Sequence, residues 1–335
     1  MKILKLALVF AAVCVITVVV AYALWKKSCN DFLENTQVSG QYIIEKGSSY
    51  PQVYRILFGG HETPKGFNYY LTRILKIDRK LHYGYYAADN ISLDHLLGNL
   101  LTGKQTLTKV NFPEGYNMYD IAATIAAAGI ATKEEMLSVF KDRAFVQELV
   151  GTSYESLEGF LAPGTYFFQK QHAPKGMAEK MVSEFYKSLP ADFEAKAAKQ
   201  GLSFYDAVTV ASIVQKETYS ADEAPLVAAV FINRIKKKML IQADPTIIYG
   251  LYESFDGNIR YKNLRDKTNR YNTYDHKGLT PTPISNPPAI ALDAVATPAN
   301  VDYLYFVATK DGKHVFSKTY EEHQRNVNIH QLGGK

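Results

Sequence analysis

The sequence predicts an α+β protein with an N-terminal transmembrane helix, a small α+β module and a larger mixed α+β domain. Three observations predict this architecture. An apolar run opens the chain, short aromatic and β-branched segments alternate with helical ones as far as residue 128, and helical spacing dominates from residue 132 onwards. The alternating segments recur at irregular intervals, so we do not expect a solenoid of repeats.

The apolar run is long enough to cross a bilayer. Residues 6–25 are uncharged and largely apolar, and a span of about 20 such residues crosses the hydrocarbon core. Residues 25–27, Trp-Lys-Lys, give an interfacial aromatic followed by a charged stop. A cleaved signal peptide is the alternative, because residues 21–23 have the small-x-small form. The run exceeds the usual length of a signal-peptide core, so we predict an uncleaved anchor over residues 6–27, preceded by residues 1–5. Positive charges nearly balance across it and leave its orientation open.

Strand, turn and helix then follow one another three times, over residues 41–57, 85–101 and 109–128. Each segment begins with aromatic or β-branched residues, turns at Gly or Asn, and enters a helix near Ser or Asn. Residues 58–80 contain a Gly-Gly pair and a proline, which predict a loop that leads into a short helix.

The rest of the chain is predicted to be mainly helical. Amphipathic spacing covers residues 132–149 and 175–199, and Pro190 divides the second stretch. The glycines and the proline of residues 157–168 indicate a loop. The further predictions, in chain order, are an apolar helix over residues 203–219, an amphipathic helix that opens residues 227–251, a polar stretch over residues 250–288, a hairpin with an Asp-Gly turn over residues 302–318, and a last helix that begins near Thr319.

Composition argues against several classes of function. The net charge of +5 is too diffuse to indicate nucleic-acid binding. The two cysteines lie in or just past the apolar run, and the eight histidines lack ligand spacing. Nucleotide, zinc-protease and serine-hydrolase motifs are missing from the sequence. We therefore expect no metal and no cofactor. Tyrosine is abundant, at 24 residues, and its rings suit sugars or partner proteins as well as a core.

The strongest candidate for chemistry is Glu217. On a helix over residues 203–219, Val210, Ile213, Val214 and Glu217 share one face. The carboxyl group therefore ends an apolar stripe, whereas the side chains of the residues just before it point elsewhere. Partial desolvation would raise the pKa of Glu217 toward the range of a general acid at neutral pH. The alternative, a partly exposed glutamate at a helix end, stays open on the pattern alone.

A second group of polar residues precedes the next apolar run. Residues 242–246 read Gln-Ala-Asp-Pro-Thr and set polar side chains on a turn. Asp244 is a candidate for the site. The same spacing is equally typical of a simple helix N-cap, which the sequence alone favours for this residue.

Several motifs, in order, resemble the MltG (YceG-like) family of endolytic murein transglycosylases. They are FPEGYNMYDIA, LEGFLAPGTY, ASIVQKET, FINRIKKKMLIQADPTIIYGL, YNTYDHKGLTPTPISNP and YLYFVATKDGKHVFSKTYEEHQRNV. The resemblance covers residues 40 to 330, and the family's catalytic glutamate belongs to the Lys-Glu-Thr that contains Glu217. Three departures stand out. Gln215 replaces a common Glu, Gly164 replaces a common Asp, and residues 278–284 replace a Pro-Pro-Gly form.

The resemblance implies that the enzyme cleaves the bond between N-acetylmuramic acid and N-acetylglucosamine and leaves a 1,6-anhydro ring. Glu217 would protonate the leaving oxygen and then accept the proton of the muramyl 6-hydroxyl, so one carboxyl group suffices, whereas ordinary glycosidases use two. The substrate-binding candidates by match to the family motifs are Gln242, Asp244, Thr246, Tyr249, Asn272, Thr273, Tyr274 and Glu158. A structural role is equally open for each of them.

The resemblance also implies an organisation and a location. Residues 40–110 resemble the family's LysM-like module, which either binds glycan or positions the catalytic domain, and residues 111–330 form the YceG-like catalytic domain. The soluble part is expected on the outer side of the cytoplasmic membrane. The expected partners are peptidoglycan strands and, as a possibility, penicillin-binding protein synthases whose strands the enzyme would terminate.

Two other readings stay open. One is a hydrolytic muramidase with Asp244 or Glu158 as the second carboxylate. The other is a glycan-binding scaffold of cell-wall synthesis without turnover. Anhydro product ends support the lytic route, reducing ends support hydrolysis, and a Glu217 substitution without effect supports the scaffold.

Overall fold

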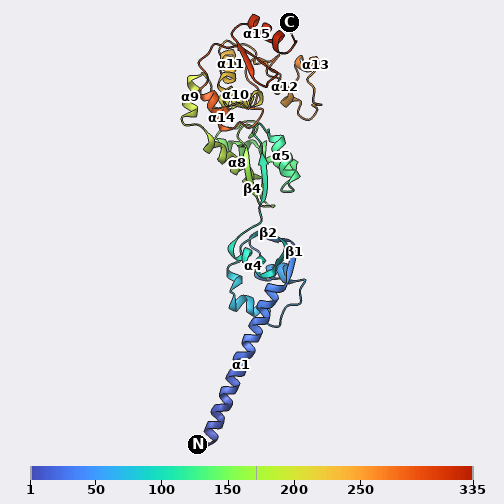
Figure 1. Ribbon diagram of the computed structural model, residues 1–335, viewed down its shortest axis with the longest axis vertical. Coiled ribbons are helices and arrows are strands. Elements are labelled where there is room, and N and C mark those ends of the chain that lie inside the picture. Colours follow the sequence, from blue (N-terminus) through green and yellow to red (C-terminus); the bar gives the residue numbers. More distant parts are fainter. Residues whose placement is uncertain (1, 171, 334–335) are drawn as a thin grey trace. The chain divides into compact units, whose positions relative to one another are not determined.

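The computed structural model describes residues 2–170 and 172–333 and divides them into two compact units. The first unit comprises residues 2–108 and 169–170, and the second comprises residues 109–168 and 172–333 (Figure 1). Helices and short strands occur in both units, and the described strands form three two-stranded sheets. The predicted α+β class is therefore confirmed.

The first unit begins with a single long helix, α1 (Lys2–Asn35), of 34 residues. Its apolar part is unburied and has the length and composition of a membrane span. The predicted apolar helix is thus present, but it continues beyond residue 27. Cys29 and Leu33 of this extension are buried in the core of the unit, and the Trp25 indole Nε1 donates a hydrogen bond to the Lys65 carbonyl at 2.8 Å. These contacts fix the end of α1 to the folded module.

The rest of the first unit packs helices on an antiparallel pair of strands. β1 (Gln37–Ile44) pairs with β2 (Gly84–Ser92), with an irregular register between Val38 and Gly40. After the strands come α2 (Tyr50–Phe58) and α4 (Leu93–Thr102), and the side chain of Ser92 caps α4. Three short helical turns lie between α2 and β2: α3 (Phe67–Tyr69), η1 (Tyr70–Ile74) and η2 (Ile77–Arg79). The predicted strand–turn–helix order is confirmed for these segments.

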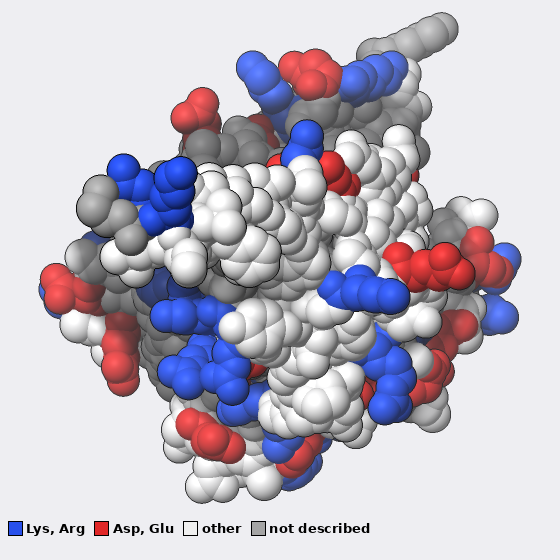
Figure 2. Space-filling view, turned by 90° about the horizontal axis from the view of Figure 1, so that it is seen from below, with Lys and Arg blue, Asp and Glu red and all other residues white. Residues whose placement is uncertain are grey.

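The large hydrophobic side chains along the apolar part of α1 are exposed, among them Leu6, Phe10, Ile16 and Leu24. Figure 2 shows uncharged residues together with Lys, Arg, Asp and Glu residues on the face seen from below.

The second unit is built around a buried helix. α10 (Phe204–Glu217) contacts α9 (Phe193–Lys199), α11 (Ala224–Lys236), α12 (Asp244–Gly250) and α14 (Ala289–Ala296), and Figure 1 shows it among these helices. The remaining elements are β3 (Thr108–Phe112), α5 (Met118–Ala127), α6 (Lys133–Phe140), α7 (Arg143–Val150), β4 (Gly164–Phe168), α8 (Pro174–Ser188), α13 (Tyr261–Leu264), β5 (Tyr305–Ala308), β6 (His314–Ser317) and α15 (Tyr320–His330).

Most of the predicted elements of this unit are confirmed. α8 and α9 are separated around Pro190, and β5 and β6 form the predicted antiparallel hairpin, in which Tyr305 faces Ser317. Thr319 caps α15 with its side chain, which accepts a hydrogen bond from the Glu322 backbone amide. The polar stretch over residues 250–288 is mainly irregular, and α13 is a single short turn of helix within it.

Three local predictions were wrong. The predicted loop over residues 157–168 ends early, because Gly164–Phe168 form β4, which pairs with β3 and places Tyr166 and Phe168 in the core. The predicted helix over residues 132–149 is broken, because the Asp142 side chain caps a new helix. Finally, α10 is buried on every side from residue 207 to residue 215, so Gln215 is buried like the apolar stripe.

Candidate active site

Glu217 is the last residue of α10, where the buried helix meets a groove. Ser203 and Asp206 form a capping box at the start of this helix. The backbone of Thr218 is extended and ends the helix, so the Glu217 side chain leaves the packed interior at this point. The groove has a volume of about 450 Å³. Its lining residues are Glu217, Phe231, Arg234, Ile241, Gln242, Asp244, Tyr274, Phe306, Val307, Ala308, His314, His323, Val327 and Gln331.

The environment of Glu217 favours its protonated form. Burial raises the pKa of the carboxyl group to about 7, and the nearby negative charge of Asp244 adds to this effect. Among the residues that the structure describes, none donates a hydrogen bond to the Glu217 carboxylate. A carboxyl group of this pKa holds a proton on about half of the molecules at pH 7 and can both give and take one.

Asp244 lies at the groove and is bonded to a tyrosine from a distant segment. The Tyr274 hydroxyl donates a hydrogen bond to Asp244 Oδ1 at 2.6 Å. Burial, followed by the effects of Asp244 and Glu217, raises the pKa of Tyr274, so the hydroxyl keeps its proton. The N-cap role that the sequence favoured for Asp244 was wrong: Ala243 is the N-cap of α12, and Asp244 is its first helical residue. The Asp244 side chain is therefore available to the groove.

Buried threonines and an asparagine hold these two segments together. The Thr273 carbonyl accepts a hydrogen bond from the Gln242 amide at 3.1 Å, and Thr273 Oγ1 accepts one from the Ala243 amide at 3.1 Å. Thr246 Oγ1 lies 2.9 Å from Thr273 Oγ1. Asn272 donates to three backbone carbonyls of the polar stretch and accepts a bond from the Tyr274 amide at 3.0 Å. Thr246, Asn272 and Thr273 are buried and do not line the groove, so they position the segments that do.

Glu158 and Tyr249 form a second polar centre outside the groove. The Glu158 side chain is fully buried and accepts hydrogen bonds from the Met118 amide at 2.9 Å, the Tyr249 hydroxyl at 2.8 Å and Asn286 Nδ2 at 2.9 Å. Neither Glu158 nor Tyr249 lines the groove. Together, these bonds tie the start of α5, the loop after α7, α12 and residue 286 to one carboxyl group.

The groove also contains residues that the sequence did not single out. Arg234 lies on α11, His314 on β6 and His323 on α15. His314 Nδ1 lies 2.7 Å from Glu223 Oε2, and this pairing lowers the pKa of Glu223 although burial opposes it. Both histidines and Arg234 fall within the motifs quoted above, but no spacing in the sequence marked them as neighbours of Glu217.

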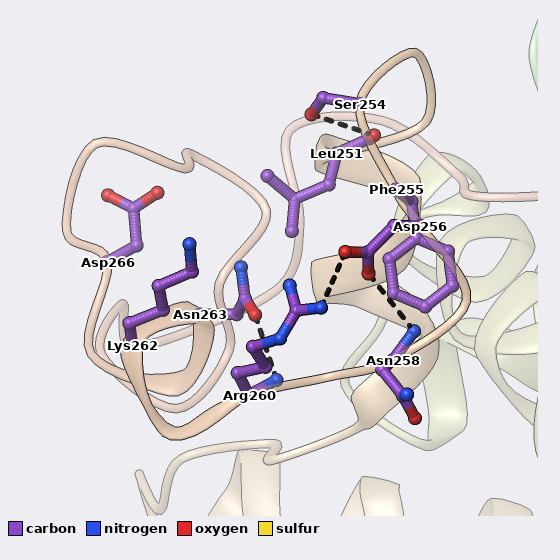
Figure 3. A pocket seen from close by; sticks show the side chains of 9 residues that line it. All are labelled: Leu251, Ser254, Phe255, Asp256, Asn258, Arg260, Lys262, Asn263 and Asp266. Atoms are coloured by element: carbon purple, nitrogen blue, oxygen red, sulfur yellow. Dashed lines mark hydrogen bonds and ion pairs between the residues drawn. The ribbon is translucent and has the colours of Figure 1, made fainter.

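Another cavity, of about 560 Å³, lies in the polar stretch. Its polar groups bond to one another: Arg260 pairs with Asp256 at 2.7 Å, and Asn263 Oδ1 accepts the Arg260 amide bond at 2.8 Å (Figure 3). Figure 3 also shows Lys262 and Asp266 apart from this pair. None of the predicted site residues lines this cavity. Among the described residues, no group of at least three His, Cys, Asp or Glu side chains is placed to hold a metal ion.

Replacing Asp244 with Asn tests the electrostatic coupling to Glu217. The negative charge of Asp244 raises the pKa of Glu217, so its removal is expected to lower that pKa. If activity requires protonated Glu217, the pH at which activity falls to half should be lower than in the wild type by up to about one unit. The rate at pH 7 should then be roughly fivefold lower than that of the wild type. The measurement is a pH–rate profile of the purified full chain. Tyr274→Phe is the matched control, because it leaves the Asp244 carboxylate in place, and an unmoved profile in Asp244→Asn would contradict the coupling.

The fold and the groove define a class: an α+β protein that begins with a long apolar helix and has one partly buried glutamic acid of raised pKa in a groove. The chain belongs to the YceG-like family, whose family model matches residues 42–329.

Individual relatives agree with this assignment. The chain is 30% identical over 302 residues to an endolytic murein transglycosylase of Bacillus subtilis, an alignment that covers 84% of this chain and 82% of that protein. It is 28% identical over 280 residues to an endolytic murein transglycosylase of Streptococcus pneumoniae, covering 75% of this chain and 51% of the relative. A crystal structure of a YceG-like protein from Listeria monocytogenes is 31% identical, with a TM-score of 0.59, and covers 87% of this chain and all of that one.

Proposed function

We propose that this protein is an endolytic lytic transglycosylase. It cleaves the β-1,4 bond between N-acetylmuramic acid and N-acetylglucosamine within peptidoglycan strands and leaves 1,6-anhydro-muramyl ends. The observation that carries the proposal is Glu217, a partly buried carboxyl group of pKa about 7 in a groove on the surface of a YceG-like chain. The names of the relatives from Bacillus subtilis and Streptococcus pneumoniae support the same activity.

The proposed reaction uses Glu217 twice. Its proton passes to the glycosidic oxygen as the bond to muramyl C1 breaks, and the N-acetylglucosamine part leaves with a free hydroxyl. The Glu217 carboxylate then accepts the proton of the muramyl 6-hydroxyl while the 6-oxygen bonds to C1. No water is consumed, and the enzyme regains its starting protonation. A pKa near neutrality serves both steps, because neither the acid nor the base form is costly to reach.

The proposed roles of the other residues follow their positions. Gln242, Asp244 and Tyr274 line the groove and are proposed to contact the sugars. Thr246, Asn272 and Thr273 are proposed to position those residues, and Glu158 and Tyr249 to hold α12 from behind. Asp244 is also proposed to stabilise the transition state, because its negative carboxylate favours the positive, oxocarbenium-like charge that develops at C1.

A hydrolytic muramidase is the second candidate, because Asp244 shares the groove with Glu217 and could activate a water. Glu158 does not fit that role, because it is fully buried away from the groove. Mass analysis of peptidoglycan fragments released by the purified protein separates the two. Anhydro ends support the lytic proposal, reducing ends support hydrolysis, and the absence of any cleavage would leave a glycan-binding scaffold.

The location and the partners are part of the same proposal. α1 anchors the chain as a single span, with the catalytic unit on the outer side of the cytoplasmic membrane, where nascent strands emerge. The first unit, with helices packed on an antiparallel strand pair, is proposed to be LysM-like and to bind or present the strand. Penicillin-binding protein synthases are proposed partners, and termination of growing strands is the proposed role. Labelling of introduced cysteines on either side of α1 in intact cells tests the orientation.

A further inference from the structure

The groove is lined by acidic and cationic side chains. Glu217 and Asp244 line it, and Arg234 lines it from α11. Tyr274 lines the same groove, and its hydroxyl donates a hydrogen bond to Asp244. A ligand that fills the groove therefore meets the acid–base group and a cation at the same time.

Arg234 is a buried cation with only neutral partners. Arg234 is only 8% exposed. Nε donates to the Leu304 carbonyl at 2.7 Å, and Nη1 donates to the Ile241 carbonyl at 2.8 Å, the Leu240 carbonyl at 3.2 Å and Gln242 Oε1 at 3.3 Å. No carboxylate among the described residues pairs with it. A buried charge without a counter-charge is costly, so the site is suited to an anion that arrives with a ligand.

One edge of the Arg234 guanidinium is left for that anion. Nη2 has no hydrogen-bond partner among the described residues. It is also not one of the fully buried side-chain atoms that lack a partner, so it is accessible from the groove. The aromatic neighbours hold the group rigid: the guanidinium lies over the Tyr305 ring at 5.1 Å, and the His323 ring stacks on Tyr305 at 5.2 Å. His323 Nδ1 is itself buried without a described partner. A planar guanidinium held in this way is pre-organised for a carboxylate.

Other carboxylates do not pair with Arg234. Glu223, which is outside the groove lining, is bonded to His314, through Nδ1 at 2.7 Å and the backbone amide at 2.9 Å. Asp244 is bonded to Tyr274. Neither carboxylate pairs with Arg234, so its charge has no carboxylate partner among the described residues.

We propose that Arg234 binds a carboxylate of the muramyl substituent and thereby selects which glycosidic bond lies at Glu217. This inference rests on the proposed function. In a peptidoglycan strand only every second sugar, the muramic acid, carries an acidic substituent, either the lactyl carboxylate of a peptide-free residue or a carboxylate of the stem peptide. A rigidly held cation in the same groove as Glu217 therefore favours one register of the alternating strand and disfavours the register shifted by one sugar.

The test compares matched strands whose carboxylates are free or amidated. Peptide-free strands with a free or an amidated lactyl group form one pair, and peptide-bearing strands with free or amidated stem-peptide carboxylates form the other. In the wild-type full chain, we expect amidation of the recognised carboxylate to raise KM about tenfold or more with kcat little changed. The pair that shows this effect identifies the source of the carboxylate.

Variants link the effect to Arg234. In Arg234→Gln, which loses the charge, KM should be high and equal for the free and amidated strands. Arg325→Gln is the control, because Arg325 is exposed on α15 and outside the groove lining, and it should keep the wild-type dependence. Thermal unfolding identifies a variant that fails to fold, in which case the wild-type comparison still decides. Cleavage of all four strands with equal KM would overturn the inference and leave the proposed function intact, whereas cleavage of none would overturn the function.

Discussion

Replacing Glu217 with Gln is expected to reduce strand cleavage by roughly 10³-fold, because the amide can neither donate nor accept the proton that both steps require. The substitution preserves the size of the side chain, and no described residue hydrogen-bonds to the carboxylate, so the fold should be retained. Strand binding should therefore stay close to that of the wild type. The measurement is the release of soluble fragments from purified strands, together with a binding assay on the same preparations.

Two controls sharpen this result. Gln215→Glu, two positions earlier on α10, adds a carboxylate in a buried position and should not restore cleavage to Glu217→Gln. Glu253, in the irregular stretch after α12, is outside the groove lining, so Glu253→Gln should cleave at the wild-type rate. Cleavage by Glu217→Gln at more than about a tenth of the wild-type rate would mean that another group carries the chemistry.

The largest effect on stability is expected for Glu158→Ala. This substitution leaves the Met118 amide, the Tyr249 hydroxyl and Asn286 Nδ2 without their buried acceptor and opens a cavity. The free energy of unfolding should fall by roughly 3 kcal/mol or more. Thermal unfolding of the full chain in detergent measures it. Glu155→Ala, which removes an exposed ion pair with Arg270, is the matched control and should change stability by less than about 1 kcal/mol.

The same carboxyl group gives stability a pH dependence of known sign. Burial raises the pKa of Glu158 to about 8, against the opposing hydrogen bonds of Met118 and Tyr249. A carboxyl group whose pKa is higher in the folded than in the unfolded chain contributes stability at low pH, and this contribution is lost as pH rises from about 4.5 through 8. Glu158→Gln cannot ionise, so its stability should vary less over that range. A wild-type stability that increases from pH 5 to pH 8 would show that the donors outweigh burial.

The local pattern was sufficient to predict the end of α10 and the hairpin. An apolar stripe that ends in Glu217 requires only helical spacing, and the aromatic segments around an Asp-Gly turn require only strand alternation. The sequence did not predict the break at Asp142, because it depends on one capping side chain inside a longer amphipathic pattern. It did not predict the strand Gly164–Phe168, because that depends on a short aromatic run within a segment rich in Gly and Pro.

The composition of the groove could not be predicted from spacing. Arg234, Tyr274 and His314 come from separate helices, loops and strands, and only the path of the polar stretch and the hairpin brings them to Glu217. The buried bond between Glu158 and Tyr249 could not be predicted from spacing either, because these residues are 91 positions apart in the sequence. Side-chain bonds between distant segments leave no period in a sequence, so a motif can name such residues without stating which of them face one another.

The protonation of Glu217 is the central claim, and a carboxyl-carbon NMR titration of the full chain, with labelled glutamate assigned by comparison with Glu217→Gln, measures it most directly. We predict a resonance that titrates with a midpoint near pH 7 and moves to lower pH in Asp244→Asn. A midpoint near 4.5, the ordinary value for a solvated glutamate, would contradict the account, because Glu217 would then be ionised at neutral pH and unable to act as the acid.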